Sequence, residues 1–346
     1  MGVRILHSAD WHLDSPFSAF SENQRQLLRE KQREIPGLVA EIARREGCNL
    51  VLLAGDLFDG NPSRDTVEAV KDALESCGVP VFISPGNHDF CGPGSPWREE
   101  TWPENVHIFT GSLESVPLPE LDCRVWGAGY KSMDCPALLD NFRAEGPETY
   151  QIGLFHGDPT TANSPCCPIT AAQVRQSGLA FLALGHIHKA GYFRAGDTLC
   201  AWPGCPMGRG WDETGDKGLC VVTLEERAQL RPISLDLPKF YRLEGEAEEL
   251  EARLPGVAND DFYQITLTGT TDSDIRALAD KLASFPNLTW EDKREAPLDL
   301  WEDCGEDTLR GIYFRRLKEI SGEEPNALLA AEISRKLLEG REVKLP

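Results

Sequence analysis

The feature that most constrains the fold is a series of short apolar segments that each run into a polar motif. The segments at 3–8, 49–54 and 79–84 have the length and apolar content of buried strands, and segments with helical periodicity at 23–46 and 64–77 separate them. The motifs are, in chain order, Asp10-x-His12, Gly55-Asp56-x-x-Asp59, Gly86-Asn87-His88-Asp89, His156-Gly157 and Gly185-His186-x-His188. Alternating strands and helices with polar residues at the strand ends predict an α/β fold with a parallel sheet. Its carboxyl edge is the expected place for a functional site.

Length and composition indicate an ordinary globular protein. The chain has 346 residues, of which 41% are hydrophobic and 26% charged, so we expect one large domain or two with a sizeable core. We find no apolar run of membrane-spanning length and no signal-peptide pattern, which favours a soluble cytoplasmic protein without membrane contact. The eleven cysteines lack CxxC spacing and are expected to be reduced thiols.

The net charge of −21 restricts the possible partners. Proteins that bind nucleic acid are usually basic on at least one face. A chain this acidic must bind something else, concentrate its basic residues, or use metal ions as the source of positive charge. Candidates for a local basic strip are Lys131, Lys189, Arg194 and Arg209.

The pattern of the chain changes after the first two thirds. Strands are expected at 192–202, 218–224 and 231–236, and the Leu237-Pro238 pair marks a boundary. We therefore predict a first domain at 1–237, a small α+β domain at 238–304, and a helical tail at 305–346 that could dock a partner. The small domain is expected to contain an acidic helix at 244–253 and an alternating strand at 262–268. The tail is expected to contain two amphipathic helices, at 308–320 and 326–338.

Seven residues of the motifs form a mixed oxygen and nitrogen donor set, which suits manganese, iron or zinc. They are Asp10, His12, Asp56, Asn87, His156, His186 and His188. Seven ligands are too many for one ion and about right for two ions that share a bridging carboxylate. Asp56 is the predicted bridge, because it stands alone at a glycine turn. The i, i+2 spacing of the two other pairs would place both side chains on one side of an extended strand end. Two such ions lie ~3.5–4 Å apart and can clamp the attacking and leaving oxygens of a phosphate displacement.

Five of the seven histidines lie inside the motifs, which is hard to explain by packing alone. His7 and His107 lie outside them and are expected to be ordinary core residues. His88 is left out of the seven-residue ligand set. Asp59 could accept a hydrogen bond from His88 and fix its tautomer, although a turn or helix-capping role is equally open.

Together these motifs resemble the calcineurin-like metallophosphoesterases. The stretches at 7–17 and 203–210 are similar to those of SbcD-type DNA repair exonucleases, particularly the YhaO-like bacterial branch. The resemblance covers about residues 1–237. It implies a four-layer α/β/β/α sandwich, two divalent metal ions (Mn²⁺, with Fe²⁺ or Zn²⁺ as alternatives), a small C-terminal capping domain, and a coiled-coil SMC-like ATPase partner of the SbcC or YhaN type. A homodimer is a further assembly to be tested.

Carried over position by position, the resemblance divides the ligands between two metals. Asp10, His12, Asp56 and His188 are assigned to the first metal, and Asp56, Asn87, His156 and His186 to the second. His88 and Asp59 are assigned to catalysis, with His88 stabilising or protonating the departing oxygen. Asp14, Asp89 and Arg209 are candidates for supporting or substrate contacts.

Three functions compete on the sequence alone. The first is a metal-dependent nuclease acting on DNA ends, and the second is a phosphatase or a cyclic-nucleotide or other small-molecule phosphodiesterase. Gly60 and Asp89 stand where protein phosphatases of this kind carry Arg and Glu, which counts against that subclass. The third is a scaffold subunit with a decayed metal site, which the complete donor set disfavours.

Overall fold

The computed structural model describes residues 2–341 and 343 and shows a mixed α/β protein with three sheets. The chain divides into two compact units. The first unit comprises Met1–Arg242 and Asn259–Tyr263, and the second comprises Leu243–Ala258 and Gln264–Pro346. The predicted domain limits at 237 and 305 remain proposals.

The first sheet of the first unit has the strand order β12-β11-β1-β2-β3-β4. Its strands are β1 (Val3–Ser8), β2 (Leu50–Leu53), β3 (Val81–Ile83), β4 (Val106–Ile108), β11 (Gly218–Leu224) and β12 (Gln229–Ser234). β1 to β4 are parallel, whereas β11 pairs antiparallel with β1 and with β12. The carboxyl ends of the first three strands therefore meet at one edge.

The second sheet has the strand order β5-β6-β7-β8-β10-β9. Its strands are β5 (Glu114–Leu118), β6 (Cys123–Gly127), β7 (Tyr150–His156), β8 (Phe181–Gly185), β9 (Gly191–Ala195) and β10 (Thr198–Trp202). The four central strands β6, β7, β8 and β10 are parallel, and the edge strands β5 and β9 are antiparallel to their neighbours. The segment at 192–202, expected as strand, is a hairpin that turns at Gly196, whose φ is +65°.

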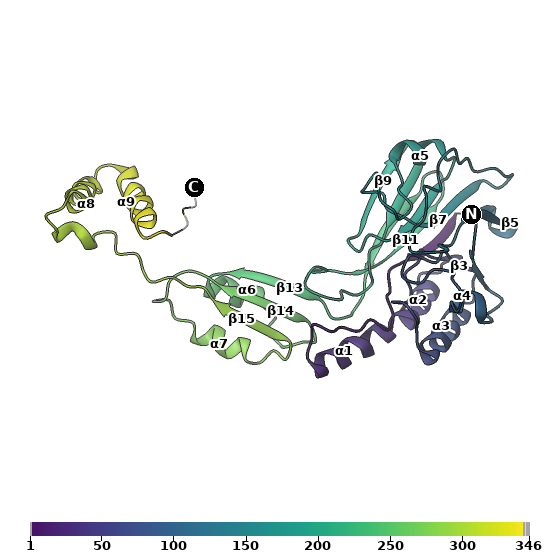
Figure 1. Cartoon of the computed structure of the whole chain (residues 1–346), viewed down its shortest axis with the longest axis horizontal. Coiled ribbons are helices and arrows are strands. Elements are labelled where there is room, and N and C mark those ends of the chain that lie inside the picture. Colours follow the sequence, from purple (N-terminus) through teal and green to yellow (C-terminus); the bar gives the residue numbers. More distant parts are fainter. Residues whose placement is uncertain (1, 342, 344–346) are drawn as a thin grey trace. The chain divides into compact units, whose positions relative to one another are not determined.

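The two sheets face each other, and helices cover their outer faces (Figure 1). Alternation decides the layers: Leu50 and Leu52 of β2 lie in the core between the sheets, while Val51 and Leu53 pack toward the helices. The helices on that side are α1 (Glu22–Arg33), α2 (Ile35–Arg45), α3 (Arg64–Ser76) and the short α4 (Pro96–Glu99). On the other side, α5 (Ala171–Gln176) packs through Val174 into a third apolar cluster. The predicted α/β class with layered sheets is confirmed.

Pro36 accounts for the break between α1 and α2. It occupies the second position of α2, where its missing N–H costs no helical hydrogen bond, and its ring would clash with the preceding turn of a continuous helix. The expected segment at 23–46 is therefore two helices.

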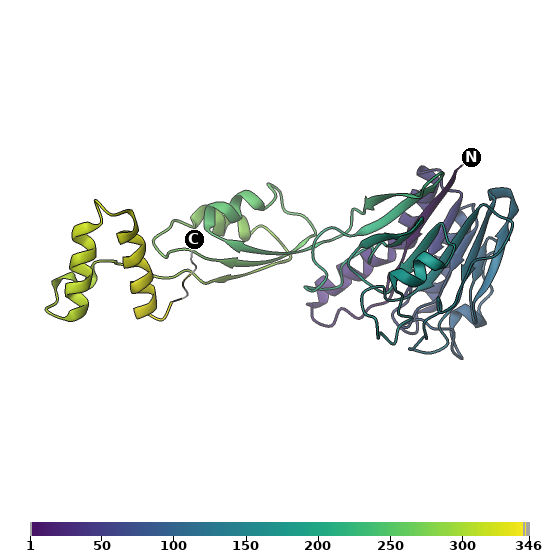
Figure 2. The same cartoon turned by 90° about the horizontal axis from the view of Figure 1, so that it is seen from above.

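The sheet of the C-terminal part has the order β13-β14-β15. Its elements are β13 (Phe240–Gly245), α6 (Ala247–Arg253), β14 (Phe262–Leu267), α7 (Arg276–Leu282) and β15 (Leu288–Asp292). The acidic helix expected at 244–253 was wrong in its first residues, which belong to β13, because pairing with β14 overrides their local helix propensity. The tail contains α8 (Leu309–Ile320) and α9 (Pro325–Leu338), which pack side by side (Figure 2). Among the described residues, no helix combines the length and apolar character needed to cross a membrane.

Candidate metal centre

The seven predicted ligands come together where the carboxyl ends of the strands of both sheets meet. Asp10 and His12 follow β1, Asp56 follows β2 and Asn87 follows β3, all in the first sheet. The others come from the second sheet: His156 ends β7, and His186 and His188 follow β8. The structure thus gathers all the predicted ligands, and their assignment to metals remains a prediction.

Sharp backbone turns, rather than extended strand ends, present four of the seven ligands. Asp10, His12 and Asp56 have φ values of 54°, 47° and 52°, in the left-handed region that non-glycine residues rarely adopt, and His186 has a φ of 84°. The expected extended backbone was therefore wrong for Asp10 and His12, although both side chains still reach one ligand group. Such residues each cost on the order of 1–3 kcal/mol and persist only where the surroundings fix them. Here the amide of Asp10 donates to the carbonyl of Gly55 at 3.0 Å, and the amide of His12 to that of Asp56 at 2.9 Å.

Gly86 is required because the loop after β3 closes tightly on Asp56. A Cβ at Gly86 would lie 2.2 Å from Oδ1 of Asp56, so no larger residue fits without moving the carboxylate. The same oxygen accepts a hydrogen bond from the amide of His88 at 2.9 Å. The turn at 86–88 therefore fixes the position of the predicted bridging carboxylate.

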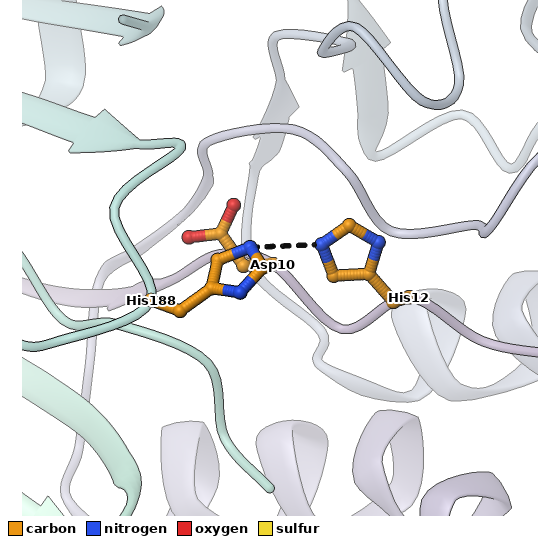
Figure 3. Close-up of side chains that lie close together, drawn as sticks. All are labelled: Asp10, His12 and His188. Carbon is orange, nitrogen blue, oxygen red and sulfur yellow. Dashed lines mark hydrogen bonds between the residues drawn. The ribbon is translucent and has the colours of Figure 1, made fainter. Parts of the chain in front are cut away.

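The first group of ligands contains Asp10, His12 and His188 (Figure 3). One ligand atom from each lies within 4.8 Å of the others, and the Nε2 atoms of His12 and His188 face each other at 3.1 Å. Oδ2 of Asp10 is buried without a hydrogen-bond partner. Nε2 of His12 also lies 3.8 Å from Oδ2 of Asp56, so this group reaches the predicted bridge.

The second group is built around His156, which is fully buried. Its Nδ1 lies 2.8 Å from the carbonyl oxygen of Ala54, and a carbonyl can only accept, so Nδ1 carries a proton. In the neutral ring, the Nε2 lone pair then points at Oδ1 of Asn87 at 3.0 Å and Oδ2 of Asp56 at 3.3 Å. Nδ1 of His186 also approaches Oδ1 of Asn87, at 3.2 Å.

These donor atoms fit divalent cations, because the Nε2 lone pair of His156 faces the oxygens of Asn87 and Asp56 with no proton between them. Such an arrangement is stable only if a positive charge sits among the lone pairs, either a metal ion or a proton. Burial by itself lowers the pKa of His156, but the carboxylates of Asp56 and Asp10 outweigh burial and raise it to about 9. The centre therefore attracts positive charge strongly, and the mixed oxygen and imidazole set suits manganese, iron or zinc.

His88 and Asp59 form a pair at the mouth of the centre. Nδ1 of His88 lies 3.1 Å from Oδ1 of Asp59, and the His88 side chain is 41% exposed. The hydrogen bond to Asp59 raises the pKa of His88 above its usual range. Contacts with His12 and His88 hold the pKa of Asp59 well below the usual range of an aspartate. The hydroxyl of Ser15 donates to Oδ2 of Asp59 at 3.0 Å and restrains the carboxylate further.

Asp14 and Asp89, two of the candidates for supporting or substrate contacts, accept hydrogen bonds from nearby loops. The carboxylate of Asp14 accepts from the amide of Ser63 at 2.8 Å and the hydroxyl of Thr66 at 2.9 Å, at the start of α3. That of Asp89 accepts from the amides of Gly86 at 2.7 Å and Leu57 at 2.8 Å. These contacts make Asp14 and Asp89 residues that hold loops in place.

The two histidines outside the motifs lie outside the ligand groups. His7 is completely buried in β1 beside Cys220, and burial lowers its pKa to about 3, so it is neutral. His107 lies on the edge strand β4, with its ring against Phe82 and Phe109.

Arg209 is the basic candidate that reaches the centre. Its Nη2 lies 3.1 Å from Nδ1 of His188. Arg194 donates instead to the carbonyl of Ala228, and Lys131 to the hydroxyl of Ser112. The contacts of these three residues do not join them into a continuous basic strip.

Glu213 is the residue that the sequence argument missed. Its Oε1 lies 2.5 Å from Nδ1 of His188, and its side chain is only 8% exposed. Burial by itself raises the pKa of Glu213, but the hydrogen bond with His188 and the charge of Arg209 outweigh it and hold the pKa well below its usual range. The available signal was an acidic residue four positions after Arg209 in a glycine-rich loop, which is too weak to single it out.

A pocket of about 270 Å³ opens beside His88. Phe90, Pro93 and Pro96 provide its apolar walls, and Asn61 is a polar residue of its lining. A Cβ at Gly92 would lie 2.6 Å from the Phe90 ring, so the glycine lets this ring lie close to the backbone.

Comparison with known proteins finds the following similarities. A family model for calcineurin-like phosphoesterases matches residues 3–190. The metallophosphoesterase YhaO of Bacillus subtilis, itself uncharacterized, is 34% identical over 237 residues, covering 64% of this chain and 57% of YhaO. The SbcD component of the nuclease SbcCD from Staphylococcus epidermidis is 31% identical over 315 residues, covering 78% of this chain and 80% of SbcD. Among solved structures, a dimetal phosphatase from Danio rerio aligns with a TM-score of 0.44 at 15% identity, covering 66% of this chain and 95% of the phosphatase.

Proposed function

Because this chain belongs to the calcineurin-like phosphoesterase family, it is a metal-dependent phosphoesterase, and we propose that its substrate is DNA. In this proposal it is a repair exonuclease of the SbcD-like branch that hydrolyses phosphodiester bonds at DNA ends. The similarity to a nuclease component over four fifths of that component's length supports the branch. Since the chain spans little more than half of YhaO, nothing about the activity of that whole protein is carried over.

The observation that carries the proposal is the pocket beside His88. A phosphodiester has an organic group on both sides of the phosphorus, so its leaving group needs room next to the residue that protonates it. The pocket has that room, and its aromatic and proline walls suit the face of a nucleobase. Hydrolysis of the phosphomonoester of a small alcohol would not require such a space.

The residues divide the work in this proposal. Asp10, His12, Asp56 and His188 would hold one divalent cation, and Asp56, Asn87, His156 and His186 the other. When bound, the two cations supply Lewis acidity for the phosphate and lower the pKa of water toward neutrality. His88 donates a proton to the departing oxygen, and Asp59 keeps its ring oriented and protonated. We propose Mn²⁺ as the native metal, from the family resemblance, with Fe²⁺ or Zn²⁺ as alternatives.

We also propose that the helical tail docks a coiled-coil ATPase subunit. Leu309 is 85% exposed and Leu337 66% exposed, on α8 and α9 respectively. Together with Tyr313 and Leu338 they line an apolar groove of about 670 Å³. Amphipathic helices of a partner bind such grooves through their apolar faces. Since this chain has a net charge of −21, a partner would also provide a basic surface for DNA, and we place both proteins in the cytoplasm.

The test compares end-labelled duplex and single-stranded DNA with bis(p-nitrophenyl) phosphate in the presence of Mn²⁺. The proposal expects shortening of labelled DNA from its ends, and the matched control is the Asp56→Asn variant, which should be inactive on every substrate. Rapid turnover of the small phosphodiester without cleavage of DNA in Mn²⁺, Fe²⁺ or Zn²⁺ would favour a small-molecule phosphodiesterase instead.

A further inference from the structure

The loop at 203–217 encloses the predicted ligand His188 from two sides. One backbone group and one side chain of the loop contact the carbonyl of His188: the amide of Cys205 donates to it at 3.3 Å, and Nζ of Lys217 donates to the same oxygen at 3.3 Å. A Cβ at Gly204 would lie 2.6 Å from that carbonyl oxygen, and Gly204 has a φ of +74°. The loop therefore fixes the backbone of His188.

The imidazole ring of His188 is held by Glu213 of the same loop. Nδ1 of His188 has two neighbours, Oε1 of Glu213 at 2.5 Å and Nη2 of Arg209 at 3.1 Å. A carboxylate only accepts and a guanidinium only donates, so a single Nδ1 cannot serve both. The shorter, charge-assisted contact decides: Nδ1 carries the proton and donates to Glu213, while Arg209 donates to the same carboxylate oxygen at 3.2 Å.

This protonation state makes Nε2 of His188 the metal-binding atom. With the proton on Nδ1, the Nε2 lone pair points at Nε2 of His12 and into the first ligand group, where a cation would sit (Figure 3). We infer that Glu213 is a positioning residue that fixes the tautomer and orientation of His188 and thereby sets the affinity of the centre for its first divalent cation. The inference deepens the proposed function and rests on the part of it that assigns His188 to a metal.

The contacts of the Glu213 carboxylate show why another residue would not replace it. Oε1 accepts from His188 and from the guanidinium of Arg209. Oε2 accepts from the backbone amide of Arg209 at 2.8 Å and from the thiol of Cys205 at 3.7 Å. Every one of these contacts comes from a donor. Glutamine has the same shape, but whichever way its amide is turned, its NH₂ group faces at least one of these donors.

Glu148 offers a matched control elsewhere in the first unit. Its side chain is also 8% exposed, and it accepts from Nε of Arg124 at 2.9 Å, just as Glu213 is paired with Arg209. Its hydrogen bonds with Arg124 involve none of the predicted ligands. Glu148→Gln therefore removes a carboxylate that is paired with an arginine, without touching His188.

The experiment titrates the metal-free full chain with Mn²⁺ by calorimetry and compares wild type, Glu213→Gln and Glu148→Gln. Losing the partner of a metal-binding histidine typically costs 10–100-fold in affinity, so we expect a loss of about that size at one site in Glu213→Gln, with the other site unchanged. Glu148→Gln should bind both ions as wild type does. Equal affinities in Glu213→Gln and wild type would overturn the inference.

A second measurement reads the tautomer directly and needs neither metal nor activity. Long-range ¹H–¹⁵N spectra of histidine-labelled, metal-free protein, with His188 assigned through a His188→Asn variant, should show the proton on Nδ1. In Glu213→Ala the preference for Nδ1–H should be lost, and a His188 proton on Nε2 in wild type would refute the inference. If Glu213 governs Mn²⁺ affinity but wild type cleaves no DNA, the proposed function fails and this inference stands. If DNA is cleaved while Glu213→Gln binds Mn²⁺ like wild type, this inference fails and the proposed function stands.

Discussion

Replacing His88 by glutamine tests whether this histidine acts in the chemistry or in metal binding. His88 lies beside the centre but is outside the seven predicted ligands, and its ring nitrogen is held by Asp59 at 3.1 Å. A positioned general acid contributes on the order of 10²–10⁴ in rate, which corresponds to about 2.7–5.4 kcal/mol of barrier. We therefore expect His88→Gln to lose that much kcat while binding two Mn²⁺ ions with unchanged affinity.

Asp59→Asn should act through the same histidine and cost less. Asparagine retains an acceptor oxygen at a similar place, so only the charge of the contact is lost. Water at the half-exposed His88 screens that charge, and we expect about a tenfold loss, or about 1.4 kcal/mol. The carboxylate of Asp59 raises the pKa of His88, so removing it lowers that pKa. The limb of the pH–rate profile at which activity falls as the acid deprotonates should therefore move to lower pH.

The assay measures kcat against pH on bis(p-nitrophenyl) phosphate, with Mn²⁺ stoichiometry determined in parallel. His107→Gln is the matched control, since His107 is similarly exposed at 39%, faces Glu114 at 3.7 Å, and lies on an edge strand outside the ligand groups. Parallel loss of metal and activity in His88→Gln would mean that His88 is a ligand and would refute the assigned role. A profile of Asp59→Asn that moves to higher pH would contradict the link between the two residues.

Three further predictions concern the bridge, the tail and DNA. Asp56→Asn should lose one of two Mn²⁺ ions and nearly all turnover with an unchanged circular dichroism spectrum; retention of both ions would contradict the bridging role. Arg335 is fully buried and pairs with Asp303 at 2.6 Å, so Arg335→Ala should destabilise the α8–α9 pair by about 3–5 kcal/mol in hydrogen exchange, against under about 0.5 kcal/mol for the exposed Arg316→Ala. With a net charge of −21, nuclease-dead Asp56→Asn protein should bind DNA weakly and with a shallow salt slope, which a coiled-coil partner should steepen; tight, steeply salt-dependent binding by the isolated chain would refute this.

Local patterns in the sequence were enough to predict the class of fold and the set of residues that meet at the centre. Strand and helix periods placed β1, β2 and β3 correctly, and the polar motifs fell at their ends. Because carboxyl ends of parallel strands share one edge, the motifs after β1 and β2 were expected to meet there, and the amide of Asp10 donates to the carbonyl of Gly55 at 3.0 Å. Asp10 and His186 meet although their strands lie in different sheets, with the amide of His186 donating to Oδ1 of Asp10 at 2.9 Å.

The way each side chain is held depends on contacts that exist only in the folded chain. The left-handed turns at Asp10 and Asp56 leave no periodic trace in the sequence, since long-range hydrogen bonds and close glycines impose them. The start of β13 was missed because pairing with a distant strand outweighs local helix propensity. Glu213 lies in a loop without periodicity, and its partner His188 is 25 residues away. The role of Glu213 depends on the tertiary structure, because only folding brings its carboxylate into contact with His188 and Arg209.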